Sequence, residues 1–224
     1  MKKQKIVNWH EKAKGRAKEL ITYARTQKSG QIYEHGLQFL KKFKHSLYKG
    51  KTHTFLIDFH KSFATQPIAI ALKTNNKAGK TEILFEARLK FEKNTILVES
   101  IQGTKLLAEM REFESLAGIP TSRFIIKEII NQAKNMNYNQ VKLRRAERHQ
   151  SYKNPNWTTM LTKQEKQLHL KVALGDASLN EIKELTIIKN EAIKTIRLRM
   201  KKLYDVVAAA EGFKTEGNYF VKNI

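Results

Sequence analysis

Cationic and aromatic side chains alternate over a short stretch in the second half of the chain. The stretch contains Arg144, Arg145, Arg148, Tyr152, Lys153 and Trp157. Arg and Lys bind phosphate oxygens, and the rings of Tyr and Trp stack on bases, so this mixture is typical of a surface that binds nucleic acid. The alternative is a solvated loop that covers Trp157. These residues form a candidate nucleic-acid interface.

The charge of the whole chain agrees with such a partner. The 224 residues carry 43 Lys and Arg against 21 Asp and Glu, for a net charge of +22. Fourteen of the cations lie within residues 1–51, where only Glu11, Glu19 and Glu34 oppose them. Such an excess attracts polyanions through counterion release, without sequence-specific contacts. RNA, DNA and an anionic membrane all qualify, and the alternative is a Lys-rich chain whose solvated faces are merely basic.

The sequence lacks the residues and motifs that several other kinds of chemistry need. With no Cys the chain forms no disulfide and no thiolate metal site. Its seven His are scattered and predict no metal site, and no Walker loop, nucleophile elbow or paired-carboxylate nuclease pattern is present. No apolar run is long enough to span a membrane and no signal segment is evident, so we expect a soluble, cytoplasmic protein. The oligomeric state is left open.

The first 51 residues predict a basic helical region. Apolar residues recur at spacings of three and four from Trp9 to about Gln27, and again from Ile32 to about Leu47. Gly30 separates the two runs, so we expect a helical hairpin. Residues 52–224 then form the main domain, with a helical insertion near 158–187.

The next segment is rich in β-branched and aromatic residues. Strands are predicted over residues 54–59, 67–74, 81–91 and 95–101. The middle two flank a turn-forming stretch at residues 75–80 and should form a hairpin. Consecutive strands of this kind most simply make an antiparallel meander.

Two helices follow the meander. Apolar spacing predicts a helix from Leu106 to Leu116, which Gly118 and Pro120 close. Thr121 or Ser122 should then cap a strongly apolar helix.

The rest of the chain completes a mixed α/β pattern. Residues 141–143 predict a strand parallel to the last strand of the meander, because a helix separates the two. Residues 152–157 read as irregular, helices dominate from Ser178 to Ala210, and residues 218–221 predict a final strand.

Several segments resemble the GNAT acyltransferases. The loop Gly118-Ile119-Pro120-Thr121-Ser122, the helix after it and the strand Val141-Lys142-Leu143 are similar to the core of that family. Glu211-Gly212-Phe213-Lys214 and Gly217-Asn218-Tyr219-Phe220 resemble its closing turn and last strand, while Ile101-Gln102-Gly103 and Arg148-His149-Gln150-Ser151-Tyr152 resemble its VirK-like relatives. The resemblance implies a GNAT-like, mostly antiparallel sheet with one parallel crossover.

The resemblance also implies a cofactor loop and two catalytic residues. Gly118, Ile119, Thr121 and Ser122 would bind the pyrophosphate of an acyl-CoA through backbone N–H groups at a helix N-terminus. Glu99 would act as general base on an amine, and Tyr204 as general acid toward the leaving thiolate. Pro120, which lacks an N–H, stands where the family has a second glycine. The residues alone also allow an ordinary turn before a core helix, an outward-facing Glu99 and a half-buried Tyr204.

Three functions remain open. The first is binding of nucleic acid, with RNA favoured and DNA left open, and an RNA or RNA-associated substrate would reconcile the basic loop with the fold. The second is acyl-CoA-dependent transfer to the amine of a small molecule or a protein. The third is DNA binding by a C-terminal winged helix-turn-helix, whose second helix would follow Ile188 and carry the cations Lys189, Lys194, Arg197, Arg199, Lys201 and Lys202. That helix also has a wide apolar stripe, which is typical of a helix packed on a sheet.

Overall fold

The computed structural model describes residues 36, 38–61, 68–75, 81–104 and 106–224. The chain divides into two compact units, one formed by residues up to Arg144 together with Val207–Ile224, and the other by Arg145–Val206. The first helix of the expected N-terminal hairpin lies outside the described residues. Helix α7 (Leu179–Ala210) contributes residues to both units.

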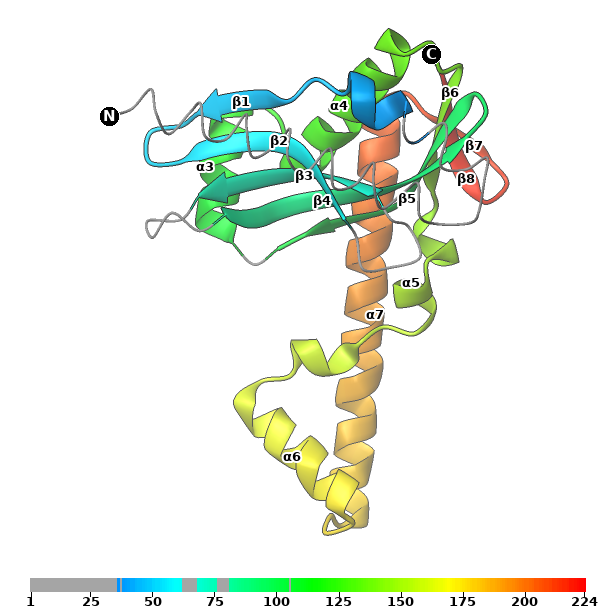
Figure 1. The fold of residues 1–224 in the computed structure, drawn as a ribbon. Helices are drawn as coiled ribbons and strands as arrows, with labels where there is room; N and C mark the ends of the chain where they lie inside the picture. The colour runs from blue at the N-terminus through cyan, green and yellow to red at the C-terminus, as the bar shows by residue number, and fades with distance from the viewer. Residues whose placement is uncertain (1–35, 37, 62–67, 76–80, 105) are drawn as a thin grey trace. The chain divides into compact units, whose positions relative to one another are not determined.

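The first unit is built on an eight-stranded sheet (Figure 1). Its strands are β1 (Ser46–Lys49), β2 (Thr54–Lys61), β3 (Ile68–Asn75), β4 (Thr81–Glu92), β5 (Thr95–Gly103), β6 (Gln140–Arg144), β7 (Lys214–Glu216) and β8 (Tyr219–Asn223). Their order is β1-β2-β3-β4-β5-β6-β8-β7, and only β5 and β6 pair in parallel. The expected mixed α/β class, the antiparallel meander and the parallel crossover are thus confirmed.

The core of this unit lies between the sheet and two helices, α3 (Leu107–Ala117) and α4 (Thr121–Asn135). Strand β3 is buried from Ile68 to Thr74, as expected for a nearly continuous apolar run in a central strand. Helix α4 packs against β3, β4, β5 and β6 and buries Ile125, Ile126 and Ile129. Apolar residues three and four apart share one helix face, which explains why this segment covers the sheet.

The second predicted N-terminal helix ends earlier than the sequence suggested. Residues 38–42 are helical, but Ser46–Lys49 form strand β1 instead of continuing the helix to Leu47. Strand β1 pairs antiparallel with β2, where Leu47 lies opposite Leu56. Pairing with a sheet edge therefore overrides the helical period of this segment.

The second unit is helical. Two 3₁₀ turns, η1 (Ala146–Arg148) and η2 (Trp157–Met160), flank the short helix α5 (Gln150–Lys153), so the stretch expected to be irregular is partly helical. Helix α6 (Lys163–Leu174) begins with a capping box formed by Thr162 and Glu165. The Lys171 ammonium lies 2.6 Å from the Glu181 carboxylate and so joins α6 to α7.

Helix α7 runs without a break from Leu179 to Ala210. A capping box formed by Ser178 and Glu181 begins it, at the point where the sequence predicts the start of helical structure. The expected start of a second helix after Ile188 is wrong, because i to i−4 hydrogen bonding continues through that point. The turn that should separate the two helices of a winged helix-turn-helix is therefore absent from α7. Among the described residues, no helix combines the length and the apolar character needed to cross a membrane.

Candidate nucleic-acid interface

A groove of about 420 Å³ opens on the second unit, between α5 and α7. Tyr152 of α5 lines it together with Asn190, Ile193, Lys194, Arg197, Leu198 and Lys201 of α7. The α7 residues recur at intervals of three and four, so one face of one helix presents them all. This groove, called the α5–α7 groove, combines three cations, an aromatic ring, an amide and two apolar side chains, and no carboxylate lines it within the described part of the chain.

Arg197 holds the two sides of the groove together. Its Nε donates a hydrogen bond to the carbonyl of Tyr152 (3.0 Å), and its Nη2 donates one to the carbonyl of Lys153 (3.2 Å). The guanidinium carbon lies 5.6 Å from the centre of the Tyr152 ring, within the range of a cation–π contact. Arg197 therefore ties α5 to α7 and orients the ring of Tyr152, which lines the groove.

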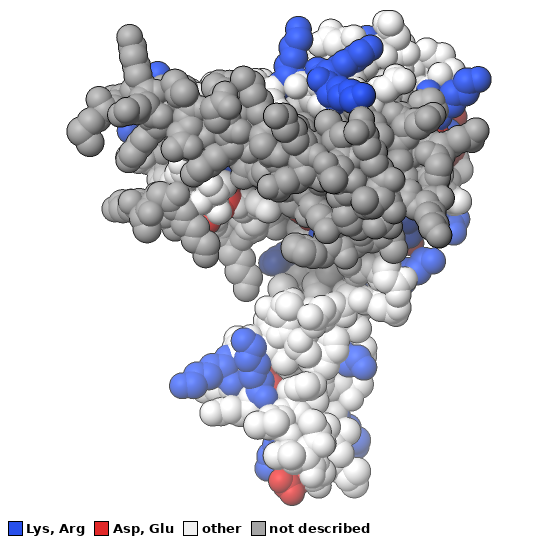
Figure 2. Space-filling view, in the orientation of Figure 1, with Lys and Arg blue, Asp and Glu red and all other residues white. Residues whose placement is uncertain are grey.

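The two lysines of the groove remain open to solvent. The side chain of Lys194 is 77% exposed and that of Lys201 is 52% exposed. Each has a carboxylate at 3.9 Å, Glu191 for Lys194 and Glu147 for Lys201, and exposed pairs this long contribute little. Both ammonium groups can therefore exchange these partners for phosphate oxygens. Figure 2 shows Lys and Arg side chains projecting from the region of α6 and α7, with uncharged surface between them.

The structure brings several of the predicted interface residues to the second unit. Tyr152 lines the α5–α7 groove, Lys153 is the next residue along α5, and Arg148 is exposed on η1. Arg145 lies 3.6 Å from Glu147, so its charge is partly balanced. The groove cations of α7 were expected only as part of a helix-turn-helix, although their spacing of three and four could have identified a common basic face.

The sequence suggested that the Trp157 ring stacks on bases, but this ring packs within the second unit. It is half-buried at η2, and its ring makes an edge contact with the His169 ring of α6 at 5.1 Å between centroids. The ammonium of Lys189 lies 5.8 Å from the centre of the same ring. Trp157 thus packs between α6 and α7 and does not line the groove.

Arg144 lies in the first unit, at the end of β6. Its Nη2 is 2.5 Å from Oε2 of Glu99, whose side chain is only 5% exposed. Glu99 occupies a bulge of β5, because Arg88 of β4 pairs with Ser100 and Leu89 pairs with Val98. Glu99 is therefore buried rather than outward-facing, and its carboxylate is engaged by Arg144.

The candidate cofactor loop has a different structure from the one that the resemblance implies. Gly118 adopts a left-handed conformation (φ 70°) and closes α3, as predicted. The predicted cap by Thr121 or Ser122 is wrong, because Pro120 occupies the N-cap position and no side chain of the cap residue bonds to the helix. Instead, the N–H of Thr121 donates to Oε1 of Glu114 at 2.8 Å.

The Glu114 carboxylate decides what this loop can bind. A helix N-terminus attracts anions through its free N–H groups and its dipole. Here a carboxylate from α3 already lies at that position, and Thr121 is fully buried. A pyrophosphate would face like charge, so the residues from Gly118 to Ser122 do not fit the phosphates of a CoA molecule.

The second candidate catalytic residue, Tyr204, is 1% exposed. Its ring lies 6.2 Å from the ring of His149, and both residues belong to the second unit. Glu99 belongs to the first unit.

The described residues contain no group of three His, Asp or Glu side chains that could hold a metal ion. Comparisons of the chain with protein-family models, with curated proteins and with solved structures find no match.

Proposed function

We propose that this protein binds nucleic acid, RNA in preference to DNA, through the α5–α7 groove. The observation that carries the proposal is that a single face of α7 places Lys194, Arg197 and Lys201 in one groove with Tyr152. Cations spaced along a groove neutralise successive phosphates, and an aromatic ring offers a surface on which a base can stack. The net charge of +22 adds a long-range attraction for any polyanion.

The lining of the groove favours a single strand over a duplex. Ile193 and Leu198 offer apolar contacts, and the side chain of Leu198 is 67% exposed. Phosphates alone give such side chains no favourable contact, whereas an unstacked base does. In a duplex the faces of the bases are stacked on one another, so the apolar side chains of the groove would stay in water.

Asn190 supports RNA over DNA. Its amide lines the groove beside the cations and can both donate and accept a hydrogen bond. The ribose 2′-hydroxyl is also both a donor and an acceptor, and it is the group that distinguishes RNA from DNA at a given site.

The experiment that tests this function is a fluorescence anisotropy titration of the full chain with single-stranded RNA, single-stranded DNA and duplexes of the same sequence. The test variant is the double substitution Lys194→Ala and Lys201→Ala. The matched control is Lys163→Ala with Lys166→Ala, which removes two exposed lysines of α6 and hence the same charge. We expect the groove variant to lose about tenfold or more in RNA affinity, since each phosphate contact contributes through counterion release.

The control separates a defined site from diffuse attraction. If the α6 variant loses as much affinity as the groove variant, binding is spread over the basic surface and the proposed groove is wrong. If neither variant binds RNA less well than the unaltered chain, the contact lies elsewhere. Unchanged helix content by circular dichroism is the check that both variants stay folded.

Acyl transfer is the second candidate, and the sheet order is the observation in its favour. The parallel pair β5 and β6, with Glu99 buried at the bulge of β5, agrees with the fold that the GNAT resemblance implies. The Glu114 carboxylate at the N-terminus of α4 weighs against CoA at the expected loop. Calorimetric titration with acetyl-CoA and a longer acyl-CoA tests this candidate, and absence of binding at millimolar concentration would exclude it.

A further inference from the structure

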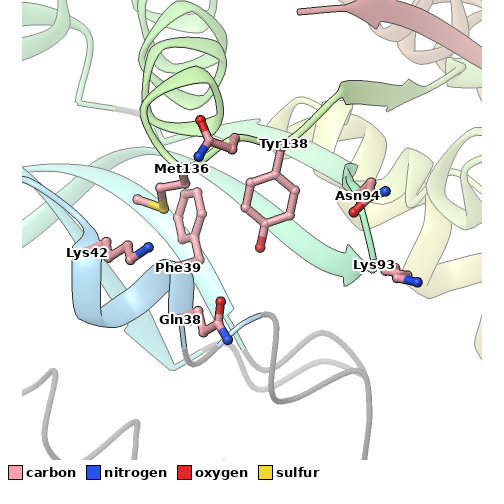
Figure 3. A pocket seen from close by; sticks show the side chains of 8 residues that line it. Gln38, Phe39, Lys42, Lys93, Asn94, Met136 and Tyr138 are labelled. Carbon is pink, nitrogen blue, oxygen red and sulfur yellow. The ribbon is translucent and has the colours of Figure 1, made fainter.

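A pocket of about 270 Å³ in the first unit has charged and apolar walls, but its charges do not converge (Figure 3). Lys42 and Lys93 lie on opposite sides of the rings of Phe39 and Tyr138. Phe39 is fully buried, so its ring offers no surface to a ligand. In the second unit, by contrast, exposed charges of both signs follow one face of α7 at regular intervals.

This face of α7 carries exposed side chains that are spaced alternately by three and four residues. Ile187 is 65% exposed and Leu198 is 67% exposed, although both are large and apolar. Such spacing keeps side chains on the contact line of a coiled coil, where two helices meet. The set is called the α7 seam and consists of Glu184, Ile187, Glu191, Lys194, Leu198 and Lys201.

The rest of the second unit packs against a different face of α7. Leu185 and Ala192 are buried on that face, and Glu181 forms its ion pair with α6 there. Arg199 donates a hydrogen bond to Sδ of Met160 in η2 at 3.7 Å. These α7 residues are spaced by four and seven, so they share one face. Within the described part of the chain, the α7 seam therefore stays exposed.

The charges along α7 are divided unequally between its two halves. From Leu179 to Glu191 the helix carries three Glu and two Lys, whereas from Ala192 to Tyr204 it carries five Lys and Arg and no acid. A parallel pair of such helices would place the two basic halves side by side. An antiparallel pair places the basic half of each helix against the half of the other that holds the acids. The charge pattern thus favours an antiparallel copy.

The α7 seam is complementary to itself in one antiparallel register. With a two-fold axis between residues 192 and 193, Glu191 of each copy lies opposite Lys194 of the other, because the two stand equally far from the axis along the helix. Glu184 and Lys201 are related in the same way. Within one copy the Lys194 ammonium is 3.9 Å from Glu191, an exposed pair that contributes little and leaves both groups available.

The same register brings the exposed apolar side chains together. Ile187 of each copy lies opposite Leu198 of the other, again at equal distances from the axis. Their contact removes from water the apolar surface that a single copy leaves exposed. Every contact across a two-fold axis occurs twice, so the apolar pair and both ion pairs are doubled.

We propose that two copies of this chain associate through the α7 seam, antiparallel and about a two-fold axis between residues 192 and 193. The partner is a second copy rather than another protein, because one helix carries both halves of every contact. Exposed ion pairs are individually weak, so the dimer should form and dissociate as the protein concentration changes.

A second copy would cover part of the α5–α7 groove. Lys194, Leu198 and Lys201 belong to both surfaces, so the second copy and RNA should compete for them. The dimer does not rest on the proposed function, because Ile187 and Glu191 do not line the groove. Self-association is measured without RNA, and Ile187→Ser keeps every residue that lines the groove, so the two proposals fail separately.

Sedimentation velocity of the full chain over an about hundredfold range of concentration tests the association. The mass should rise from 26.0 kDa towards twice that value. Ile187→Ser should raise the concentration needed for the dimer about tenfold, because it removes the apolar contact. The mass of one copy at every concentration would overturn the proposal, and it is the result expected if another part of the same chain covers the α7 seam.

Exchange of charges tests the register. Glu184→Lys with Glu191→Lys makes all four charged positions of the α7 seam positive, and Lys194→Glu with Lys201→Glu makes them all negative. Each variant alone should stay a single copy, because like charges face each other. An equimolar mixture should form a mixed dimer, since every opposed pair then has opposite signs.

The matched control is Lys163→Glu with Lys166→Glu, which changes the charge of α6 by the same amount. It should dimerise like the unaltered chain. A dimer formed by either seam variant alone, or an equal loss in the α6 control, would overturn the proposal. Unchanged helix content by circular dichroism shows that the variants are folded.

Cross-linking decides the orientation, and the chain contains no Cys of its own to interfere. Ile187→Cys and Leu198→Cys are mixed and oxidised. The antiparallel register predicts a disulfide between the two variants, because their Cα atoms must come within about 7 Å for the bond to form. Ile187→Cys alone should form no disulfide-linked dimer, and an equal yield of that dimer would overturn the antiparallel arrangement.

Discussion

Glu99 and Arg144 lie next to each other across the parallel strand pair β5 and β6, with Arg144 Nη2 2.5 Å from Glu99 Oε2. The register explains the meeting, since Val98 pairs with Leu143 and each charged residue is the next one along its strand. A cation expected to contact nucleic acid and a carboxylate expected to act as a base therefore neutralise each other.

Arg144→Ala should lower the free energy of unfolding by about 3 to 5 kcal/mol, because it leaves the buried Glu99 carboxylate without its partner. RNA affinity should be unchanged. Chemical denaturation and anisotropy measure the two effects. The double variant Arg144→Ala with Glu99→Gln should recover part of the stability, and a loss of RNA affinity at full stability would show instead that Arg144 contacts the nucleic acid.

Removal of one groove lysine should change the salt dependence of RNA binding. Lys194→Ala should reduce the slope of log affinity against log salt by about 0.7, the amount expected for one lost phosphate contact on a single strand. Titrations at four salt concentrations measure the slope. Lys163→Ala, on the exposed side of α6, should leave the slope as it is, and an equal change there would rule out a localised site.

Asn190→Ala should reduce RNA affinity about fivefold, the equivalent of one hydrogen bond of about 1 kcal/mol. The affinity for DNA of the same sequence should stay constant, because DNA lacks the 2′-hydroxyl. Paired anisotropy titrations give the ratio. Equal losses for the two nucleic acids would mean that Asn190 contacts a base or a phosphate.

Glu112 of α3 holds the turn between β1 and β2. Its Oε1 accepts hydrogen bonds from the N–H groups of Thr52 (2.8 Å) and His53 (3.2 Å). Its Oε2 accepts one from the Thr52 hydroxyl and lies 2.6 Å from His53 Nδ1. Burial acts to raise the pKa of Glu112, but the hydrogen bonds from His53 and Thr52 outweigh it and lower the pKa to about 2.

This depressed pKa predicts a pH dependence of stability. The contribution of Glu112 should be fully present above its ordinary pKa of 4.5 and should be lost as the pH falls through about 2. Allowing for solvent screening, it amounts to about 2 kcal/mol. Denaturation of the unaltered chain and of Glu112→Gln should therefore differ at pH 6 and converge near pH 2. A difference that stays constant over this range would mean that the carboxylate charge is not involved.

Trp157→Ala should destabilise the second unit by about 2 kcal/mol, since the ring packs against His169 and Lys189. RNA affinity at low temperature should change less than about twofold if the groove remains intact. Thermal melting followed by circular dichroism gives the first quantity. A large loss of RNA affinity with an unchanged melting curve would assign Trp157 to base stacking after all.

Elements with a local cause could be predicted from the sequence. The β3–β4 hairpin follows from two β-rich runs around a turn-forming stretch. The C-terminal end of α3 follows from Gly118, and the start of α7 follows from the capping box at Ser178. The parallel β5–β6 pair follows because a helical crossover must separate such strands. The attraction for polyanions follows from composition alone.

Tertiary structure decided what each charged side chain faces. Glu114 of α3 accepts a hydrogen bond at the N-terminus of α4. Arg144 forms an ion pair with Glu99. Tyr152 accepts a hydrogen bond from Arg197, which is 45 residues further along the chain. Pairing with β2 likewise turned Ser46–Lys49 from a predicted helix into a strand. Charge and periodicity are properties of neighbouring residues, whereas the availability of a cation depends on partners that only folding brings within a few ångströms.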